Sequence, residues 1–195
     1  PPGAVNPSEV LHWLSGHLPE NAILTNGAGN YAGWAHRFYL QKQFGTQLAP
    51  TSGAMGYGLP AAVAAQAVHP DRTVVCLAGD GCLMMSVQEL ATAVQHDLPI
   101  IVLVFNNGMY GTIRMHQERH YPGNVIGTAL KNPDFSAMAE SYGMKGYKVA
   151  RTDEFAAAFA AARASRRPSL IELAIDPEAI TPTTTLSAIR ANALK

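Results

Sequence analysis

The chain has 195 residues, and its fourteen basic and fourteen acidic side chains give no formal net charge. This balance, without a long run of either sign, argues against nucleic acid and anionic membrane surfaces as partners. Apolar stretches fall far short of the roughly 20 residues of a transmembrane helix, no signal-peptide pattern opens the chain, and Cys76 and Cys82 do not form a disulfide framework. We therefore expect a soluble, cytoplasmic protein.

Apolar periodicity predicts strands and helices that alternate along the chain. Strands are expected at 22–25, 47–49, 73–78, 100–105, 146–149 and 169–175, and helices at 8–18, 32–39, 59–69, 84–96, 133–142 and 153–165. Such alternation favours an α/β fold, a doubly wound parallel sheet of about six strands with helices on both faces. We expect one domain over 1–182, followed by a short helix or tail at 183–195.

The most informative pair of motifs follows two of these strands. Gly79-Asp80-Gly81 ends the run 73–78, and Asn106-Asn107 ends the run 100–105. The segment 84–96 between them has apolar residues at spacings of three and four, as one face of a helix does. A strand–helix–strand crossover joins parallel strands, so we expect Asp80 and Asn107 to stand together at the carboxyl ends of two strands, where open α/β sheets bind ligands.

These residue types fit a magnesium-diphosphate site. Mg²⁺ takes oxygen ligands, commonly one or two carboxylates together with phosphate oxygens and water, and Asp80 and Asn107 offer a carboxylate and an amide oxygen. Gly79 and Gly81 leave the backbone open to an approaching diphosphate. The N–H groups that begin the next helix can face the anion.

With these motifs, the chain resembles the diphosphate-binding domain of thiamine-diphosphate-dependent enzymes, especially the acetolactate synthase and 2-oxoacid decarboxylase group. The resemblance runs from about Pro7 to Pro182. A second segment agrees in position, because 51–62 (TSGAMGYGLPAA) is similar to the family segment that holds the aminopyrimidine ring. The resemblance implies thiamine diphosphate and Mg²⁺ as cofactors, and a 2-oxoacid as substrate.

The resemblance also implies a role for individual residues. Asp80, Asn107 and the Met109 carbonyl would hold magnesium, the Gly53 carbonyl would accept a hydrogen bond from the 4′-amino group, and Met55 would force the cofactor into its bent shape. Contacts to the diphosphate are implied for Gly29, Asn30, Tyr31, Gly81, Cys82, Tyr110 and Gly111. Met55 also has a plain physical rationale, since a flexible thioether fills an irregular gap without adding charge.

Two other segments partly match motifs of other functions, namely dinucleotide binding and zinc binding. Residues 27–32 (GAGNYA) follow a short strand like a dinucleotide fingerprint, but no acidic residue stands at 47–53 to hold a ribose. His116 and His120 have the spacing of zinc ligands on a helix, but the glutamate between them is not in the metalloprotease position. A solvated or substrate-facing helix face is the preferred interpretation of the two histidines.

Catalysis is expected to need a partner. In the family, a glutamate that acts on the aminopyrimidine lies on a separate pyrimidine-binding domain, and no glutamate here sits in a segment that resembles that domain. We therefore expect this chain to be inactive alone, as the carboxyl-terminal part of a larger enzyme or a subunit of a split one. No residue is assigned to catalysis firmly; His116 and Arg114 are candidates, with a solvated surface arginine as the preferred reading of Arg114.

The substrate stays open at this point. Acetohydroxyacid synthases usually carry a tryptophan near the position of His116, and the only tryptophans here are Trp13 and Trp34, so a benzoylformate-type decarboxylase is the alternative to an acetolactate synthase-like carboligase. A non-catalytic scaffold is a third possibility, and the intact metal ligands argue against it. The apolar helices at 59–69 and 84–96 further favour a homo-oligomer.

Overall fold

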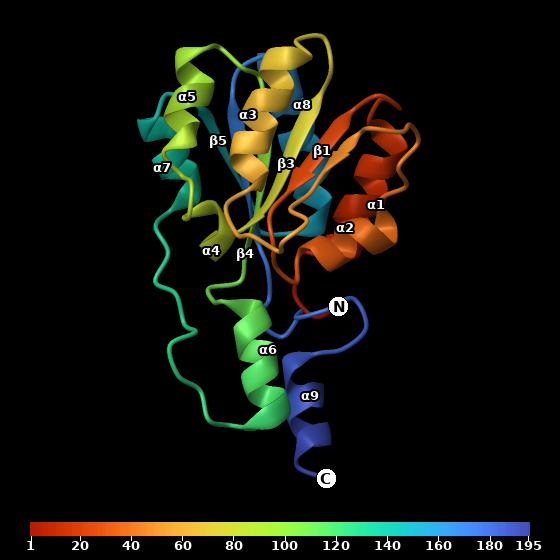
Figure 1. Ribbon diagram of the computed structural model, residues 1–195, viewed down its shortest axis with the longest axis vertical. Helices are drawn as coiled ribbons and strands as arrows, with labels where there is room; N and C mark the ends of the chain where they lie inside the picture. The colour runs from red at the N-terminus through yellow and green to blue at the C-terminus, as the bar shows by residue number, and fades with distance from the viewer.

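Six parallel strands form one sheet in the computed structural model, which describes all residues from 1 to 195 (Figure 1). The strands lie in the order β2-β1-β3-β4-β6-β5. Their bounds are β1 Ile23–Asn26, β2 Gln47–Leu48, β3 Val74–Gly79, β4 Ile101–Asn106, β5 Lys145–Val149 and β6 Ser169–Ala174. The predicted α/β fold with a six-stranded parallel sheet is therefore confirmed.

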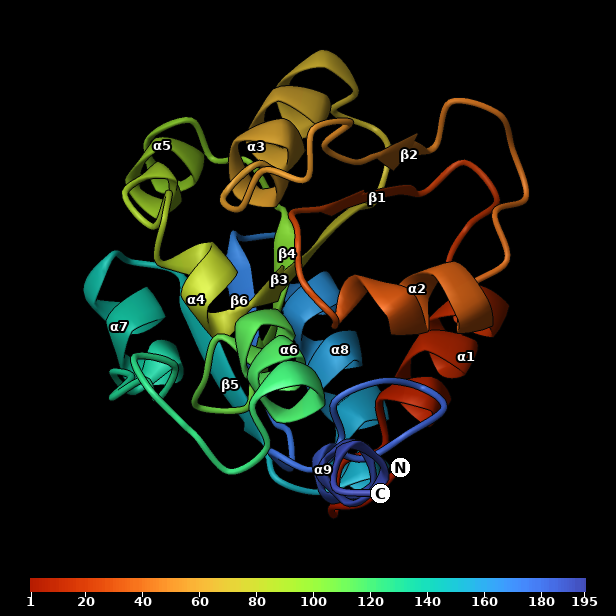
Figure 2. The same cartoon turned by 60° about the horizontal axis from the view of Figure 1, so that its bottom comes forward.

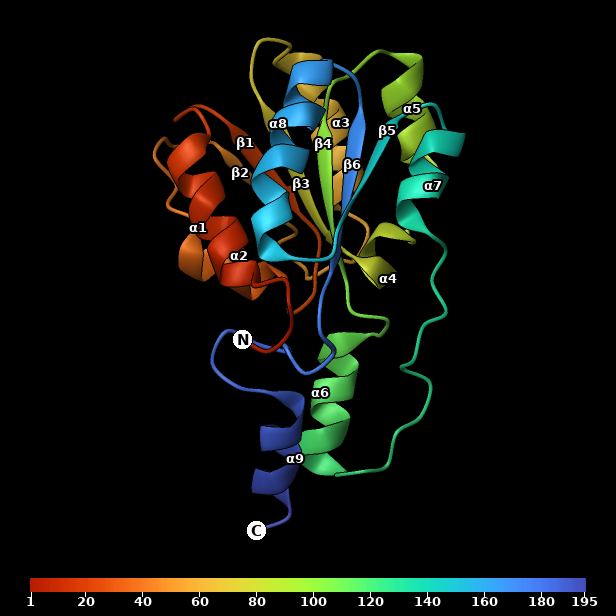
Figure 3. The same cartoon turned by 180° about the vertical axis from the view of Figure 1, so that it is seen from behind.

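Helices cover both faces of this sheet (Figures 2 and 3). Helices α1 (Pro7–His17), α2 (Ala32–Phe38) and α8 (Phe155–Ser165) lie on one face. Helices α3 (Gly58–Val68), α5 (Glu89–Gln95) and α7 (Phe135–Ser141) lie on the other. The remaining elements are α4 Asp80–Leu83, α6 Gly111–His120, the short 3₁₀ turn η1 Thr152–Glu154 and α9 Leu186–Ala193. None of these helices combines the length and apolar character needed to cross a bilayer.

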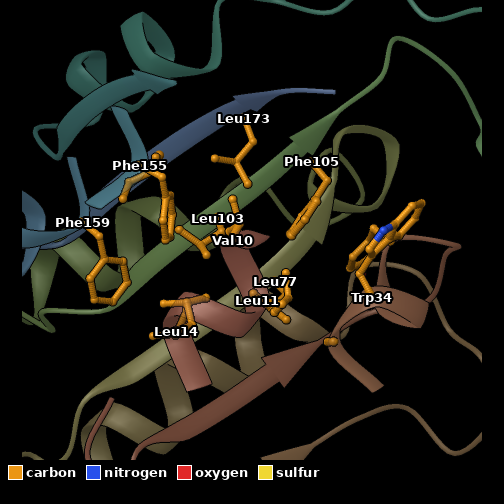
Figure 4. Packing of buried hydrophobic residues seen from close by; sticks show 14 of the residues in the cluster. Val10, Leu11, Leu14, Trp34, Leu77, Leu103, Phe105, Phe155, Phe159 and Leu173 are labelled. Carbon is orange, nitrogen blue, oxygen red and sulfur yellow. The ribbon is translucent and has the colours of Figure 1, made fainter. Parts of the chain in front are cut away.

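The two cores follow from the alternation of side chains along each strand. In β4, Leu103 and Phe105 face the α1–α2–α8 layer, whereas Val102 and Val104 face the α3–α5–α7 layer. Figure 4 shows the first core, where Phe155 of α8 lies beside apolar side chains of α1 and of the sheet. Since burial of each such side chain contributes about 1.5–3 kcal/mol, the sheet is a rigid base for the loops at its ends.

The path of the chain brings the predicted motifs together. After β1 the chain runs outward to β2, then returns to add β3 and β4 on the other side of β1. Strands β3 and β4 are parallel neighbours, with Gly79 opposite Phe105. Asp80 and Asn107 therefore follow two adjacent strands at one edge of the sheet, which confirms the placement predicted from the crossover.

The helix predicted at 84–96 is wrong in its first half. One helical turn, α4, ends at Leu83, and α5 begins only at Glu89. Between them Met85 N donates to the Cys82 carbonyl and Ser86 N to the Leu83 carbonyl, as in tight turns, and the Ser86 hydroxyl donates to the Gly56 carbonyl at 2.8 Å. This tie to a distant loop diverts the chain, so Met84 and Met85 are exposed.

Helices α6 and α9 form a separate arm beyond the carboxyl ends of the strands (Figure 1). The two helices share a small apolar cluster, which consists of Met115, Ile180, Leu186 and Ile189. The segment 183–195 therefore contains a packed helix, as the helical alternative for this segment predicted. The helix α6 itself does not appear among the elements predicted from periodicity.

A buried charge cluster joins these two helices. The Glu118 carboxylate on α6 is fully buried, accepts a hydrogen bond from Arg190 Nε of α9 at 2.7 Å and from Gly123 N at 2.9 Å, and also pairs with the guanidinium of Arg114. Arg114 is itself buried. The preferred reading of Arg114 as a solvated surface residue is wrong, because the carboxylate one helical turn further on draws its side chain inward.

The pH dependence of stability offers a test of this cluster. The hydrogen bond from Arg190, aided by those from Gly123 and Arg114, lowers the pKa of Glu118 to about 2 despite its burial. A carboxyl whose pKa is lower in the folded state stabilises the fold above its unfolded pKa, and this contribution disappears as the pH falls toward the folded value. We expect Glu118→Gln to lower the melting temperature at pH 7, and the gap to wild type to close between about pH 5 and about pH 2.

Breaking a buried pair costs about 3–5 kcal/mol, and the loss here should lie near the lower end because the Arg190 side chain is 42% exposed. Thermal melts from pH 7 to pH 2 measure the gap. The control is Glu140→Gln, which alters an exposed carboxyl on α7. A gap that stays constant over this range would contradict the assignment.

A second test concerns the close approach of α3 to β1. A Cβ at Gly58 would lie 2.8 Å from Gly27 N and 2.9 Å from the Asn26 carbonyl carbon, both of them backbone atoms. We expect Gly58→Ala to destabilise the protein by about 1–3 kcal/mol, as overpacking does. Gly16→Ala is the matched control, because open space surrounds this helical glycine and alanine should gain up to about 1 kcal/mol there. Urea unfolding measures both, and a neutral Gly58→Ala would refute the close approach.

Candidate functional site

A pocket opens at the carboxyl ends of β1, β3 and β4, where the chain order of the sheet reverses. Its empty space, open solvent included, is about 630 Å³. Of the residues predicted to bind cofactor or metal, the following line it: Gly29, Asn30, Tyr31, Met55, Asp80, Gly81, Cys82, Asn107, Met109, Tyr110 and Gly111. Gly53 is not among the lining residues.

Asp80 is the buried carboxylate of this pocket, 3% exposed. Its Oδ1 accepts a hydrogen bond from Gly81 N at 2.8 Å, and its Oδ2 accepts bonds from Gly108 N at 2.9 Å and from Asn132 Nδ2 at 2.7 Å. Burial raises the pKa of the Asp80 carboxyl, and the bonds from Gly81, Asn132 and Gly108 offset part of this rise. A cation beside the carboxylate would favour its charged form further.

The turn after β4 supplies further oxygen atoms. Asn107 lines the pocket, and its Oδ1 accepts a weak hydrogen bond from Met109 N at 3.3 Å. No backbone N–H donates to the Met109 carbonyl. Asn106, the first residue of the pair, faces elsewhere, because its Nδ2 donates to Glu172 Oε1 of β6 at 2.7 Å. The two asparagines therefore have different tasks, and Asn107 is the one that faces the pocket.

The turn after β1 connects the sheet with α6. Asn30 N donates to Thr112 Oγ1 at 3.1 Å, and Thr112 Oγ1 donates to Asn30 Oδ1 at 2.9 Å. Tyr31 next to it is buried, donates to Cys82 Sγ at 3.2 Å and stacks on Phe105. Burial raises the pKa of the Tyr31 hydroxyl, so this side chain stays neutral and holds the turn in place.

The segment that carries Met55 docks on α4. Gly56 N donates to Cys82 Sγ at 3.3 Å, and the Gly56 carbonyl accepts the Ser86 hydroxyl. Met55 is 38% exposed and reaches the pocket wall, which leaves its thioether available to a ligand. Gly53 has a φ of +69°, a left-handed conformation that favours glycine.

The glycines of the Gly-Asp-Gly motif are explained in part by packing within the chain. A Cβ at Gly81 would lie 2.6 Å from Cε1 of Tyr110, and a Cβ at Gly79 would lie 2.9 Å from Cδ1 of Tyr31. Aromatic rings therefore approach this backbone directly. The absence of side chains here serves the two tyrosines as well as any ligand.

Two residues of the site have no distinguishing pattern in the sequence. Asn132 and Thr112 bond directly to Asp80 and Asn30, but neither was predicted to belong to the site. The catalytic candidates Arg114 and His116 do not line the pocket, and their assignment stays a prediction. His116 and His120 are exposed and stack on α6 with ring centroids 6.2 Å apart, and no group of three or more His, Cys, Asp or Glu side chains converges in the structure.

The residues present fit a magnesium-bound diphosphate. A single buried carboxylate, a neighbouring amide oxygen and an unengaged carbonyl form a hard-oxygen donor set, contributed by Asp80, Asn107 and Met109. Gly29 exposes its backbone in the pocket at a φ of +154°. This arrangement suits an anion bridged to the protein by a divalent cation.

Comparison with known proteins agrees with this geometry. The family model described as thiamine pyrophosphate enzyme, C-terminal TPP binding domain, matches residues 27–173. An acetolactate synthase large subunit from Parasynechococcus marenigrum is 36% identical over 88% of this chain and 28% of its own length, and the isozyme 2 large subunit from Escherichia coli is 34% identical over 90% and 32%. The chain thus spans less than a third of the length of these relatives.

A solved structure is also similar. The thiamine diphosphate-dependent 4-hydroxybenzoylformate decarboxylase of Rhodococcus jostii superposes with a TM-score of 0.84 at 33% identity, over 90% of this chain and 34% of that one. The family match covers β3, β4 and the turns that follow β1, β3 and β4. The chain therefore belongs to the family of C-terminal thiamine pyrophosphate binding domains of thiamine pyrophosphate enzymes.

Proposed function

We propose that this chain holds the diphosphate of thiamine diphosphate through Mg²⁺ and forms part of an enzyme that acts on 2-oxoacids. The observation that carries the proposal is that Asp80, Asn107 and Met109 line one pocket at the ends of β3 and β4. The side-chain oxygens of Asp80 and Asn107 and the carbonyl of Met109 would hold Mg²⁺, which in turn takes phosphate oxygens. When bound, thiamine diphosphate supplies the electron sink for chemistry at the carbonyl carbon of the substrate.

The residues of the chain bind and orient the cofactor. The turn 29–31 and the start of α6 would flank the diphosphate, and Met55 would support the ring system from one side of the pocket. The apolar lining, which includes Trp34, Phe105 and Ile180, excludes water from the site and so strengthens the polar interactions inside it.

The pocket also supports the need for a partner domain. Asp80 is its only carboxylate, and no glutamate lines it. Exposed apolar side chains stand at or near its mouth: Met55 and Ile113 line it, and Met85 lies against Gly56. Exposed apolar groups of this kind mark interaction surfaces. We propose that a pyrimidine-binding domain, on the same polypeptide or on a second subunit, covers this mouth and supplies the glutamate, and that the assembled protein is a cytoplasmic homo-oligomer.

The relatives support two candidate activities. Acetolactate synthase-like carboligation is supported by the large-subunit relatives. A benzoylformate-type decarboxylase is the second candidate, supported by the 4-hydroxybenzoylformate decarboxylase neighbour. Assay of the complete gene product with pyruvate and with benzoylformate, with analysis of the products, distinguishes an acetolactate-type product from a released aldehyde.

Cofactor binding is tested with Asp80→Ala. Removal of a residue that hydrogen-bonds to a metal ligand typically weakens metal binding by about 10–100-fold. Removal of the ligand itself should therefore weaken the Mg²⁺-dependent binding of thiamine diphosphate by about 100-fold or more. Thermal melts of the complete gene product measure it, because a ligand that binds only the folded state raises the melting temperature. Asp71→Ala, an exposed carboxylate before β3, is the control. Absence of a ligand shift in the wild type would favour the scaffold.

Dependence on a partner is tested with the isolated chain. We expect it to unfold cooperatively but to turn over neither pyruvate nor benzoylformate, because its pocket lacks the glutamate. Addition of the pyrimidine-binding domain should restore activity. Turnover above the buffer background by the isolated chain would refute this part of the proposal.

A further inference from the structure

Asn132 joins the two motifs of the pocket although it belongs to neither. Its Nδ2 donates to Asp80 Oδ2 at 2.7 Å and to Asn106 Oδ1 at 2.9 Å. It is half-buried, in the segment between α6 and α7. A single amide thus bridges the end of β3 to the end of β4.

The backbone is held in place on both sides of Asn132. Before Asn132, Tyr110 N donates to the Thr128 carbonyl at 2.9 Å and Leu130 N donates to the Gly108 carbonyl at 2.8 Å, so this stretch runs antiparallel to the turn after β4. After Asn132, the fully buried Phe135 begins α7. The position of Asn132 is therefore set by the same turn that presents Asn107.

The orientation of the amide follows from the network. Glu172 is an acceptor, so Asn106 must direct its Nδ2 toward Glu172 Oε1 and its Oδ1 toward Asn132. Asn132 must then present its NH₂ group, whose two hydrogen atoms serve Asn106 and Asp80. The acceptor-only carboxylates at both ends leave no alternative amide orientation.

The acceptor capacity of Asp80 is consequently divided unequally. A carboxylate oxygen has about two acceptor sites. At Asp80 the sites of Oδ2 are both used, by Gly108 N and by Asn132, whereas the hydrogen bond found at Oδ1 is that from Gly81 N. One oxygen is saturated, and the other retains a site.

We propose that Asn132 is a positioning residue, which occupies one oxygen of Asp80 so that the carboxylate offers a cation a single oxygen. This inference rests on the proposed function of the pocket as a magnesium site. Mg²⁺ requires a near-ideal octahedron, whereas Ca²⁺ accepts six to eight oxygen atoms in irregular geometry and often takes carboxylates bidentately. Asn132 therefore favours Mg²⁺ over Ca²⁺.

The test compares the two cations in the complete gene product with Asn132→Ala. The measured quantity is the concentration of Mg²⁺ or Ca²⁺ that gives half-maximal binding of thiamine diphosphate, followed by calorimetry. We expect the Mg²⁺ requirement to rise about 10–100-fold, as for loss of an outer partner of a metal ligand, and the Ca²⁺ requirement to rise by clearly less. If Asn132 only held the loop in place, the variant would raise the required concentrations of Mg²⁺ and Ca²⁺ by the same factor.

Two variants serve as controls. Asn124→Ala removes an exposed asparagine of the same segment, for which no side-chain hydrogen bond is present, and should leave both requirements unchanged. Asn132→Ser retains a small polar group that cannot span Asp80 and Asn106, and it should shift the ratio in the same direction. If Asn132→Ala is unfolded in the absence of ligand, the ratio of Ca²⁺ to Mg²⁺ requirement is measured in Asn132→Ser instead.

The outcomes separate the two proposals. A wild type without cation-dependent cofactor binding overturns the proposed function of the pocket. If the wild type binds the cofactor but the Asn132 variants leave the ratio of Ca²⁺ to Mg²⁺ requirement unchanged, only the role of Asn132 is overturned. An equal effect of Asn124→Ala would overturn it as well.

Discussion

A carboxylate buried at the end of a parallel strand needs hydrogen-bond donors from elsewhere, and the pocket is organised around this need. Asp80 obtains them from Gly81 at the start of α4, from Gly108 after β4 and from Asn132 before α7. A buried charge without such partners would cost several kcal/mol. The bonds that satisfy Asp80 therefore also draw these segments into one wall.

Much of the fold can be predicted because its signals are local. A parallel sheet buried on both faces requires strands that are apolar throughout, and β3 and β4 are such runs. The break between α4 and α5 could not be predicted, because it depends on the bond from Ser86 to the carbonyl of Gly56. Periodicity reports what one face of a segment buries, and it is silent about a tie to a distant loop.

The site divides in the same way. Asp80 and Asn107 end predictable strands, so the topology of the sheet places them together. The role of Asn132 and the packing of α6 against α9 could not be predicted, because these contacts join parts of the chain far apart in sequence, as the pair of Glu118 with Arg190 does. The interpretation of Arg114 as a surface residue failed for a related reason, since Glu118, with which it pairs, is buried where α6 meets Arg190 of α9.

The arm has its own small apolar cluster, apart from the two cores that bury the sheet. A unit held by few buried contacts opens at a lower free energy than the whole domain. Gly111 and Ile113 of α6 line the pocket together with the sheet edge. A ligand that fills the pocket therefore favours the position of the arm described here, and a more stable arm favours ligand binding in turn. We therefore expect sequence changes in α9, which contributes no residue to the pocket lining, to alter the affinity of a ligand that they do not contact.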